Sequence, residues 1–170
     1  HPDQKEKMSA DLNHALSTTL TIASNEYKYV AKIETDFGEI PAVLCHVNEL
    51  NQAFLNIIVN ASHAIADVVK NSDQKGLIRI STRRDGDSVV ISISDTGGGI
   101  PEGVRSKIFE PFFTTKEIGK GTGQGLSIAR SVVVDKHAGA LSFESEMGKG
   151  TTFTIRLPVP PPQDVCAVAA

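Results

Sequence analysis

Four segments of this chain alternate between apolar and polar residues, and this pattern constrains the fold more than any other feature. The segments are 77–83, 88–95, 140–145 and 151–158, with a shorter alternation over 29–33. A period of two is typical of strands with one buried face, whereas sheets covered on both faces read as continuous apolar runs. Turn residues at 85–87 and 147–150 separate these strands pairwise. We therefore expect an α+β fold, a two-layer sandwich with helices on one face of a mixed, mostly antiparallel sheet.

Three segments have the helical periodicity needed to cover such a sheet: one from Ser9 or Asp11 to about residue 20, one over 47–70, and one over 126–137. The segment 47–70 is the longest. Its apolar side gathers Leu50, Phe54, Ile58, Ala61, Ile65 and Val68. The opposite stripe carries Glu49, Asn56, Asn60 and His63. Asparagine is a poor helix former, and carboxamide oxygens suit a hard cation such as Mg²⁺. The amides either serve such a ligand or only cap a neighbouring loop and meet solvent.

Composition places the chain among ordinary globular domains. It has 170 residues, 40% of them hydrophobic and 22% charged, which favours one domain over 9–158 between a polar arm (1–8) and a proline-rich tail (159–170). The net charge of −3 argues against a nucleic-acid partner. No uninterrupted apolar run approaches the roughly 18 residues of a membrane span, so we expect a soluble piece. Cys45 and Cys166 fit no metal or redox spacing, which favours a reducing compartment.

Eight of the 14 glycines lie within residues 95–125, seven of them in two separate segments. The first, Asp95–Pro101, follows a strand and contains three consecutive glycines, against which a flat ligand can lie. Asp95 could there accept a hydrogen bond from an exocyclic amino group, although a purely structural turn is an equal alternative. The second, Gly119–Leu126, precedes a helix. Its alternating glycines expose amides that favour phosphate, yet it matches neither a Walker loop nor GxGxxG, and a flexible loop without ligand is the alternative.

Between the glycine segments lies the sequence IFEPFFTTK, residues 108–116, with three of the seven phenylalanines. Aromatic side chains in such a connecting segment indicate docking, either against the body of the domain or against a partner. Lys116 at its end could reach a phosphate as a point charge.

The order of these segments is more specific than any one of them. The asparagine helix, DTGGGI, FEPFFTTK, GKGTGQGL and GKGTTF resemble the ATP-binding catalytic domain of sensor histidine kinases, within the superfamily shared with gyrase, Hsp90 and MutL. The resemblance covers residues 27–158. It implies a Bergerat-type sandwich with a mobile ATP lid, and ATP and Mg²⁺ as cofactors.

The resemblance also implies roles for residues. Asn60 would be the metal ligand, with Asn56 beside it on the phosphates and Asp95 on the adenine amino group. Asn56, Asn60 and Lys116 would be catalytic. The implied nucleotide-binding set is Asn56, Asn60, His63, Asp95, Gly97, Gly99, Ile100, Lys116, Gly121, Thr122, Gly123, Gly125, Leu126 and Thr151. Phe153 would join Thr151 at the adenine end, and Phe109, Phe112 and Phe113 would form a lid segment that docks on a partner domain.

Three positions depart from the family pattern. His63 stands where many relatives carry Lys or Arg, and Lys116 replaces a frequent arginine, so that charge is kept without a bidentate fork. Gln124 interrupts the common GTGLGL.

The resemblance implies a cytoplasmic protein histidine kinase of a two-component system, homodimeric at full length. It would donate the γ-phosphoryl group to a histidine on a separate helical-hairpin domain, with a response regulator receiver domain downstream. None of the five histidines is followed by Asp or Glu, so we expect a catalytic domain without its own phosphoacceptor. One alternative is an ATP-hydrolysing machine, but its glutamate would fall at Asn56, which cannot act as a base. The other is a nucleotide-sensing scaffold without catalysis, which His63 mildly favours but the complete set of motifs speaks against.

Overall fold

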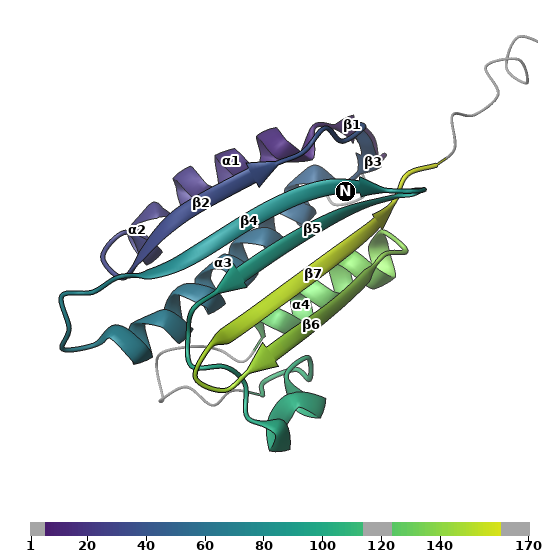
Figure 1. Cartoon of the computed structure of the whole chain (residues 1–170). Coiled ribbons are helices and arrows are strands. Elements are labelled where there is room, and N and C mark those ends of the chain that lie inside the picture. The colour runs from purple at the N-terminus through teal and green to yellow at the C-terminus, as the bar shows by residue number, and fades with distance from the viewer. Residues whose placement is uncertain (1–5, 114–123, 161–170) are drawn as a thin grey trace, which may run out of the picture.

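The computed structural model of the chain describes residues 6–113 and 124–160. Its elements in chain order are β1 (Met8–Ala10), α1 (Leu12–Ile22), α2 (Ser24–Tyr27), β2 (Ala31–Phe37), β3 (Val43–Cys45), α3 (Val47–Val69), β4 (Gly76–Asp85), β5 (Ser88–Asp95), the 3₁₀ helix η2 (Glu102–Lys107), α4 (Gly125–Arg130), the π-helix η3 (Ser131–Lys136), β6 (Ala140–Glu146) and β7 (Gly150–Pro158). Five strands form one sheet in the order β2-β4-β5-β7-β6 (Figure 1). Only β2 and β4 run parallel.

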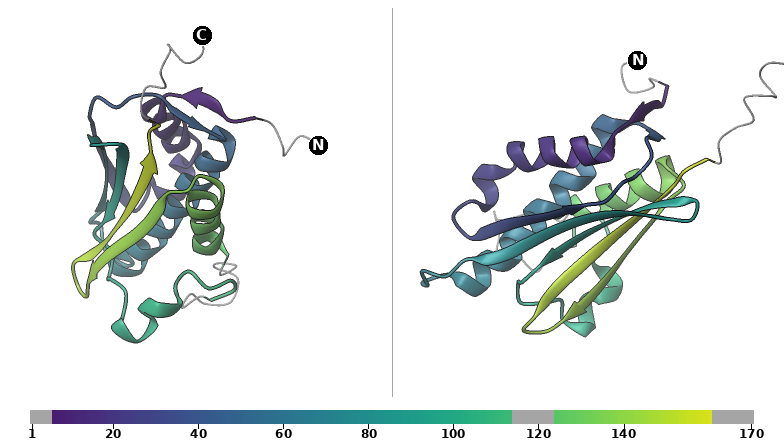
Figure 2. Two further views of the ribbon diagram at one scale, coloured as in Figure 1. Left: turned by 90° about the vertical axis from the view of Figure 1, so that its right-hand side faces the viewer. Right: turned by 45° about the horizontal axis from the view of Figure 1, so that its top comes forward.

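Helices α1, α3 and α4 cover one face of the sheet, as the turned views show (Figure 2). The inward residues of the central strands, among them Ile80, Ile91 and Ile155, are fully buried. This is the two-layer α+β sandwich with a mostly antiparallel sheet that the alternation predicts.

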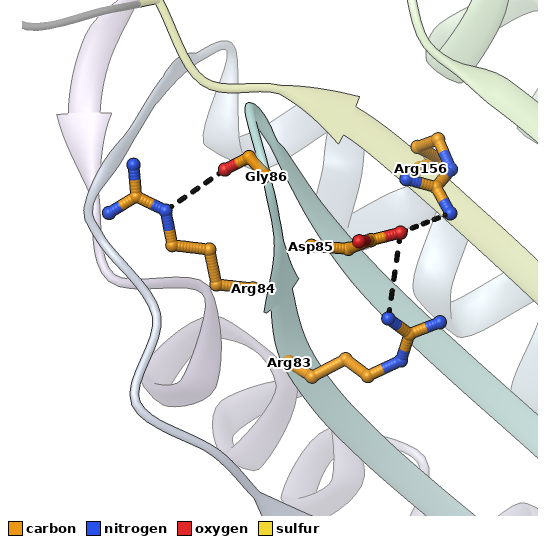
Figure 3. A network of polar contacts seen from close by, with 5 residues as sticks. All are labelled: Arg83, Arg84, Asp85, Gly86 and Arg156. Atoms are coloured by element: carbon orange, nitrogen blue, oxygen red, sulfur yellow. Dashed lines mark hydrogen bonds and ion pairs between the residues drawn. The ribbon is translucent and has the colours of Figure 1, made fainter.

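The other face of the sheet is polar. At one end of it, the Asp85 carboxylate accepts a hydrogen bond from Arg156 Nη2 at 3.0 Å and forms an ion pair with Arg83 at 3.7 Å, while Arg84 turns away to the Gly86 carbonyl (Figure 3). The hydrogen bond from Arg156 lowers the pKa of Asp85 below its usual value. These exposed contacts contribute little stability.

The α3 helix is the core of the helical layer. Leu50, Phe54, Ile58 and Ile65 on its predicted apolar side are fully buried, whereas Val68 is 53% exposed near the helix end. Within the described residues, α3 is the one helix long and apolar enough to span a membrane, with a mean hydropathy of 1.2. Asparagines and Glu49 interrupt its apolar residues, which is why no continuous run is visible in the sequence. The face of α3 that packs on the sheet is buried, as expected of a helix in a protein core.

The N-terminal region differs most from the sequence expectation. Met8, which we assigned to the end of a polar arm, lies in β1, and β1 pairs antiparallel with β3, a strand that we did not predict. The strand expected from residue 29 begins at Ala31 instead, and Tyr29 is exposed. The helix start is confirmed, because Asp11 Oδ1 accepts hydrogen bonds from the amides of Asn13 and His14.

The helix expected over 126–137 is present but changes its winding. After Arg130 it continues as a π-helix to Lys136, and His137 is the residue that follows directly. His137 Nδ1 lies 2.8 Å from the carbonyl of Val132, five residues earlier, and Nε2 accepts a hydrogen bond from the His46 amide at the start of α3. The wide turn therefore ends in a buried imidazole that joins α3 to the end of this helix.

Candidate functional site

Three positions one turn apart on α3 form a row along its half-buried face: Asn56, Asn60 and Ala64. The Asn56 carboxamide is held at both ends, because Gln52 Nε2 donates to its oxygen at 2.8 Å and its own nitrogen donates to the Gly125 carbonyl at 3.1 Å. Among the described residues, Asn60 has no recorded side-chain hydrogen bond. His63 is half-buried on the same helix.

Asp95 ends β5, and only 7% of it is exposed. Its Oδ1 accepts the Gly97 amide proton at 2.9 Å. Burial raises the pKa of Asp95 above its usual value, and this effect outweighs the backbone hydrogen bonds from Gly97 and Thr151 that lower it. A buried carboxylate with spare acceptor capacity is suited to a neutral donor such as an amino group.

The glycine segment after Asp95 packs directly on α3. A Cβ at Gly97 would lie 2.6 Å from the Ala64 Cβ, closer than side chains approach one another. Gly99 has a φ of +84°, and a Cβ there would lie 2.5 Å from the Glu146 carbonyl oxygen. The segment is therefore a closely packed wall between α3 and the β6–β7 turn, and these two glycines are required by contact and by backbone conformation.

The same segment is hydrogen-bonded to the β6–β7 hairpin. The Gly98 carbonyl accepts from the Gly148 amide at 2.9 Å, and the Ile100 amide donates to Ser145 Oγ at 2.7 Å. Thr151 lies opposite Asp95 in the register of β5 and β7 and is 6% exposed. The structure thus brings together Asp95, Gly97, Ile100 and Thr151, four of the residues expected at the base-binding end.

An open hollow of about 410 Å³ lies at this end of the sheet. It is lined by Asp95, Glu144, Ser145, Glu146, Lys149, Gly150, Thr151 and Thr152. None of the α3 asparagines lines this hollow, which is bounded by Asp95 and by residues of the β6–β7 hairpin.

The second glycine segment is described only from Gln124 onward. Gly125 begins α4 beside Asn56, where a Cβ would find ordinary contact at 3.7 Å. Leu126 packs against the core. The amides in the first turn of a helix have no carbonyl partner within that helix, so this end of α4 can meet an anion. Lys116, Gly121, Thr122 and Gly123 lie outside the described residues.

The phenylalanines between the two segments do not behave alike. Phe109 packs edge-on against Phe143 and Phe153, with ring centroids 5.9 and 6.4 Å apart, and Phe113 is half-buried against the core. Phe112 is 71% exposed with a φ of +66°. Two of the three therefore dock on the body, and only Phe112 presents its ring outward.

The site residues fit a magnesium ion that is held jointly with phosphates. No cluster of three or more His, Cys, Asp or Glu side chains suited to a metal occurs among the described residues. Mg²⁺ in nucleotide sites keeps several waters and takes few protein ligands. The half-buried carboxamide of Asn60, between the two glycine segments, is an oxygen donor of that kind.

The sequence analysis missed three residues that shape the site. Gln52 holds Asn56 from one turn earlier, a spacing that could have been noticed. Ser145 accepts from the Ile100 amide, and Arg105 in η2 donates to the carbonyls of Ile100 and Ser145 at 3.0 and 2.8 Å. The two contacts of Ser145 link residues 40 and 45 positions apart and leave no local signal.

Comparisons with known proteins show which family this chain resembles. Residues 45–161 match the family described as histidine kinase-, DNA gyrase B-, and HSP90-like ATPase. The sensor kinase CckA of Brucella abortus (strain 2308) is 38% identical over 143 residues, which are 75% of this chain and 14% of that protein. The chain spans between 14% and 34% of the length of the curated relatives compared.

Solved structures share the fold. The catalytic domain of histidine kinase ThkA superposes with a TM-score of 0.76 at 28% identity, covering 91% of this chain and 96% of that one. Full-length ShkA in complex with AMPPNP gives a TM-score of 0.74 at 26% identity, covering 89% of this chain and 31% of ShkA. ThkA in complex with the response regulator protein TrrA has the same fold, with a TM-score of 0.71 at 24% identity over 92% of this chain and 43% of ThkA.

Proposed function

This chain belongs to the family of histidine kinase-, DNA gyrase B-, and HSP90-like ATPases, and on that premise we propose that it is the catalytic domain of a two-component sensor histidine kinase. It binds Mg-ATP and donates the γ-phosphoryl group to a histidine on a helical phosphoacceptor domain. The similarity to sensor kinases and to a histidine kinase catalytic domain supports this proposal.

The observation that carries the proposal is the row on α3. Gly97 abuts Ala64 and Gly125 abuts Asn56, so the two glycine segments meet the same helix two turns apart. Two turns correspond to about 12 Å of helix rise. Asn60 lies between them. A single extended ligand with a flat base at one end and phosphates at the other suits that arrangement.

Each end has its own chemistry. At the base end, the Asp95 carboxylate accepts a hydrogen bond from the adenine amino group, and Gly97 and Gly99 place main-chain atoms instead of side chains beside the planar ring. At the phosphate end, Asn56 holds the start of α4 in place, so that its first amides face the triphosphate. Asn60 would hold Mg²⁺, which when bound neutralises charge on the phosphates.

Phosphoryl transfer needs little covalent chemistry from this domain. Positioning and charge neutralisation supply most of the acceleration, and the acceptor domain supplies the nucleophile. ATP hydrolysis by the isolated chain would need a base near the terminal phosphate. The side chain one turn before Asn60 is the amide of Asn56, which cannot accept a proton, so we expect negligible turnover without an acceptor.

The acceptor histidine, the dimer formed through the acceptor domain, a receiver domain downstream and a cytoplasmic location are parts of the same proposal. Phe112 is the exposed aromatic residue in the described part of the 108–116 segment, and its ring is available to such a partner.

The decisive test combines binding with transfer. Calorimetry should show ATP binding that is tighter with MgCl₂ than with EDTA. Incubation with γ-labelled ATP and the isolated phosphoacceptor domain of the same kinase should give acid-labile, base-stable label on that domain, and Asn60→Asp should abolish the label without unfolding the protein. Rapid hydrolysis by the chain alone would favour the ATPase alternative, and ATP binding without any transfer would favour the scaffold.

A further inference from the structure

Ser145 lies on β6 beside the base end of the site and contacts three groups at once. Its hydroxyl oxygen accepts the Ile100 amide proton at 2.7 Å. The same oxygen lies 2.9 Å from Thr151 Oγ1 and 3.3 Å from the Gly150 carbonyl oxygen. Arg105 fixes the frame around it, because its guanidinium donates to the carbonyls of both Ile100 and Ser145.

A hydroxyl group has one proton and two lone pairs, so these contacts allow only two arrangements. If Ser145 donates to Thr151, the proton of Thr151 is free to point into the site. If Ser145 donates to Gly150 instead, Thr151 can donate back to Ser145, and it then presents only lone pairs to a ligand.

The distances favour the first arrangement. The separation of 2.9 Å between the Ser145 and Thr151 oxygens fits a hydrogen bond in either direction. The Ser145 proton, however, has a closer acceptor in Thr151 than in the Gly150 carbonyl, which lies at a long 3.3 Å. This difference favours Ser145 as the donor to Thr151, which leaves the Thr151 proton available to another acceptor.

The hydrogen-bonding edge of adenine requires such a donor. Its amino group donates, which suits Asp95, and the adjacent ring nitrogen N1 only accepts. A Thr151 hydroxyl that is already occupied as a donor would leave N1 without a partner in a buried site, which weakens binding.

We propose that Ser145 is a specificity-determining residue that orients the Thr151 hydroxyl as the donor for adenine N1. Ser145 touches no part of the nucleotide in this role and acts through Thr151, so it is a positioning residue. The inference rests on the proposed binding of ATP and adds how the base is distinguished.

The test compares ATP with 1-deaza-ATP, in which a C–H group replaces N1. The measured quantity is the ratio of the two dissociation constants, obtained by calorimetry with Mg²⁺. In the unaltered protein we expect 1-deaza-ATP to bind about five- to tenfold more weakly, the value of one hydrogen bond. Ser145→Ala should reduce that ratio at least threefold, and Ser145→Thr, which keeps the hydroxyl, should restore it.

The ratio separates orientation from simple damage. Loss of the Ile100 contact in Ser145→Ala weakens both nucleotides equally and leaves the ratio unchanged, so an unchanged ratio would overturn the proposal. If the alanine variant does not fold, Ser145→Cys provides the same comparison at nearly constant volume, because a thiol is a weak donor. Ser142→Ala, an exposed position on the same strand, is the matched control and should keep the ratio of the unaltered protein.

Two outcomes in the unaltered protein distinguish this inference from its premise. Equal binding of ATP and 1-deaza-ATP would reject the role of Ser145 while leaving ATP binding intact. Failure to bind ATP at all would reject the proposed function itself.

Discussion

The side-chain nitrogen of Asn56 donates to the main-chain carbonyl of Gly125 at 3.1 Å. This contact ties the middle of α3 to the first residue of α4, and Gln52 completes it from the other side. Asn60, one turn later, has no such tie among the described residues. The two asparagines of the stripe therefore differ in kind, since one holds the framework and the other is available to a ligand.

This difference predicts opposite effects of two alanine substitutions. Asn56→Ala should lower the free energy of unfolding by about 1 kcal/mol, because a part-buried hydrogen bond is lost. Asn60→Ala should change it by less than about 0.5 kcal/mol, yet remove the strengthening of ATP binding by Mg²⁺. Urea unfolding and calorimetry with and without EDTA measure both effects. Equal destabilisation by the two variants would contradict this assignment.

Asp95→Asn should weaken ATP binding by about 1–3 kcal/mol. The asparagine can still accept the Gly97 amide proton, but it presents a dipole where the carboxylate accepted the amino group, and its own NH₂ can oppose that donor. Calorimetry measures the loss. Unaltered affinity would remove Asp95 from the base site. Asp85→Asn, far from the site on the polar sheet face, is the control and should bind ATP normally.

The same substitution should stabilise the unliganded protein at neutral pH. Burial raises the pKa of Asp95 in the folded state above its usual value of 3.8, which holds in the unfolded chain. Between 3.8 and the raised pKa, the folded chain therefore binds more protons than the unfolded one. The free energy of unfolding therefore falls as pH rises through that window. Asp95→Asn removes this fall, and its Tm should exceed that of the unaltered protein at pH 7 but not at pH 3. A lower Tm at pH 7 would mean that the carboxylate is stabilising.

His137 should make the free energy of unfolding change with pH in the opposite direction and over a different pH range. Burial, the largest effect, lowers its pKa below 6.5, and protonation would place an N–H group against the His46 amide that Nε2 now accepts. The unfolded chain then binds more protons below pH 6.5, so the free energy of unfolding should decline as pH falls from 6.5. In His137→Gln this decline should be weaker. Thermal melts between pH 5 and 8 test the difference, and identical slopes would show that His137 does not contribute.

Neighbouring glycines provide a test of the packed wall. Gly97→Ala should lower the free energy of unfolding by about 1–3 kcal/mol, because the added methyl group would overlap Ala64 on α3. Gly98→Ala is its matched control. A Cβ at Gly98 would meet only Val68, at 3.7 Å, so we expect a change within about 0.5 kcal/mol. If both variants are equally stable, the wall is not tightly packed in solution.

The alternation in the strands and the helical spacing of apolar residues were enough to predict the sheet and the long helix. A buried face repeats along the chain at every second residue in a strand and at every third or fourth residue in a helix. They failed where another segment decides the conformation. Met8 becomes a strand only through pairing with Cys45. The π-helix before His137 depends on the His137 side chain at its own end and on His46 at the start of α3.

The candidate site divides in the same way. Asp95, Gly97 and Asn56 stand out by residue type: Asp95 ends β5, Gly97 packs on Ala64 of α3, and Asn56 lies on α3 itself. Ser145 and Arg105 look ordinary in the sequence, since their importance arises from the contacts of Ser145 with Ile100 and with Arg105 across the fold. The proposed base-binding end is therefore easier to locate than to explain from the sequence alone.

The α3 helix is also the crossover that joins the parallel strands β2 and β4. During synthesis the residues that would grip a ligand's phosphates leave the ribosome well before the strand that carries Thr151. The candidate site is therefore complete only once β7 lies between β5 and β6, where it places Thr151 opposite Asp95.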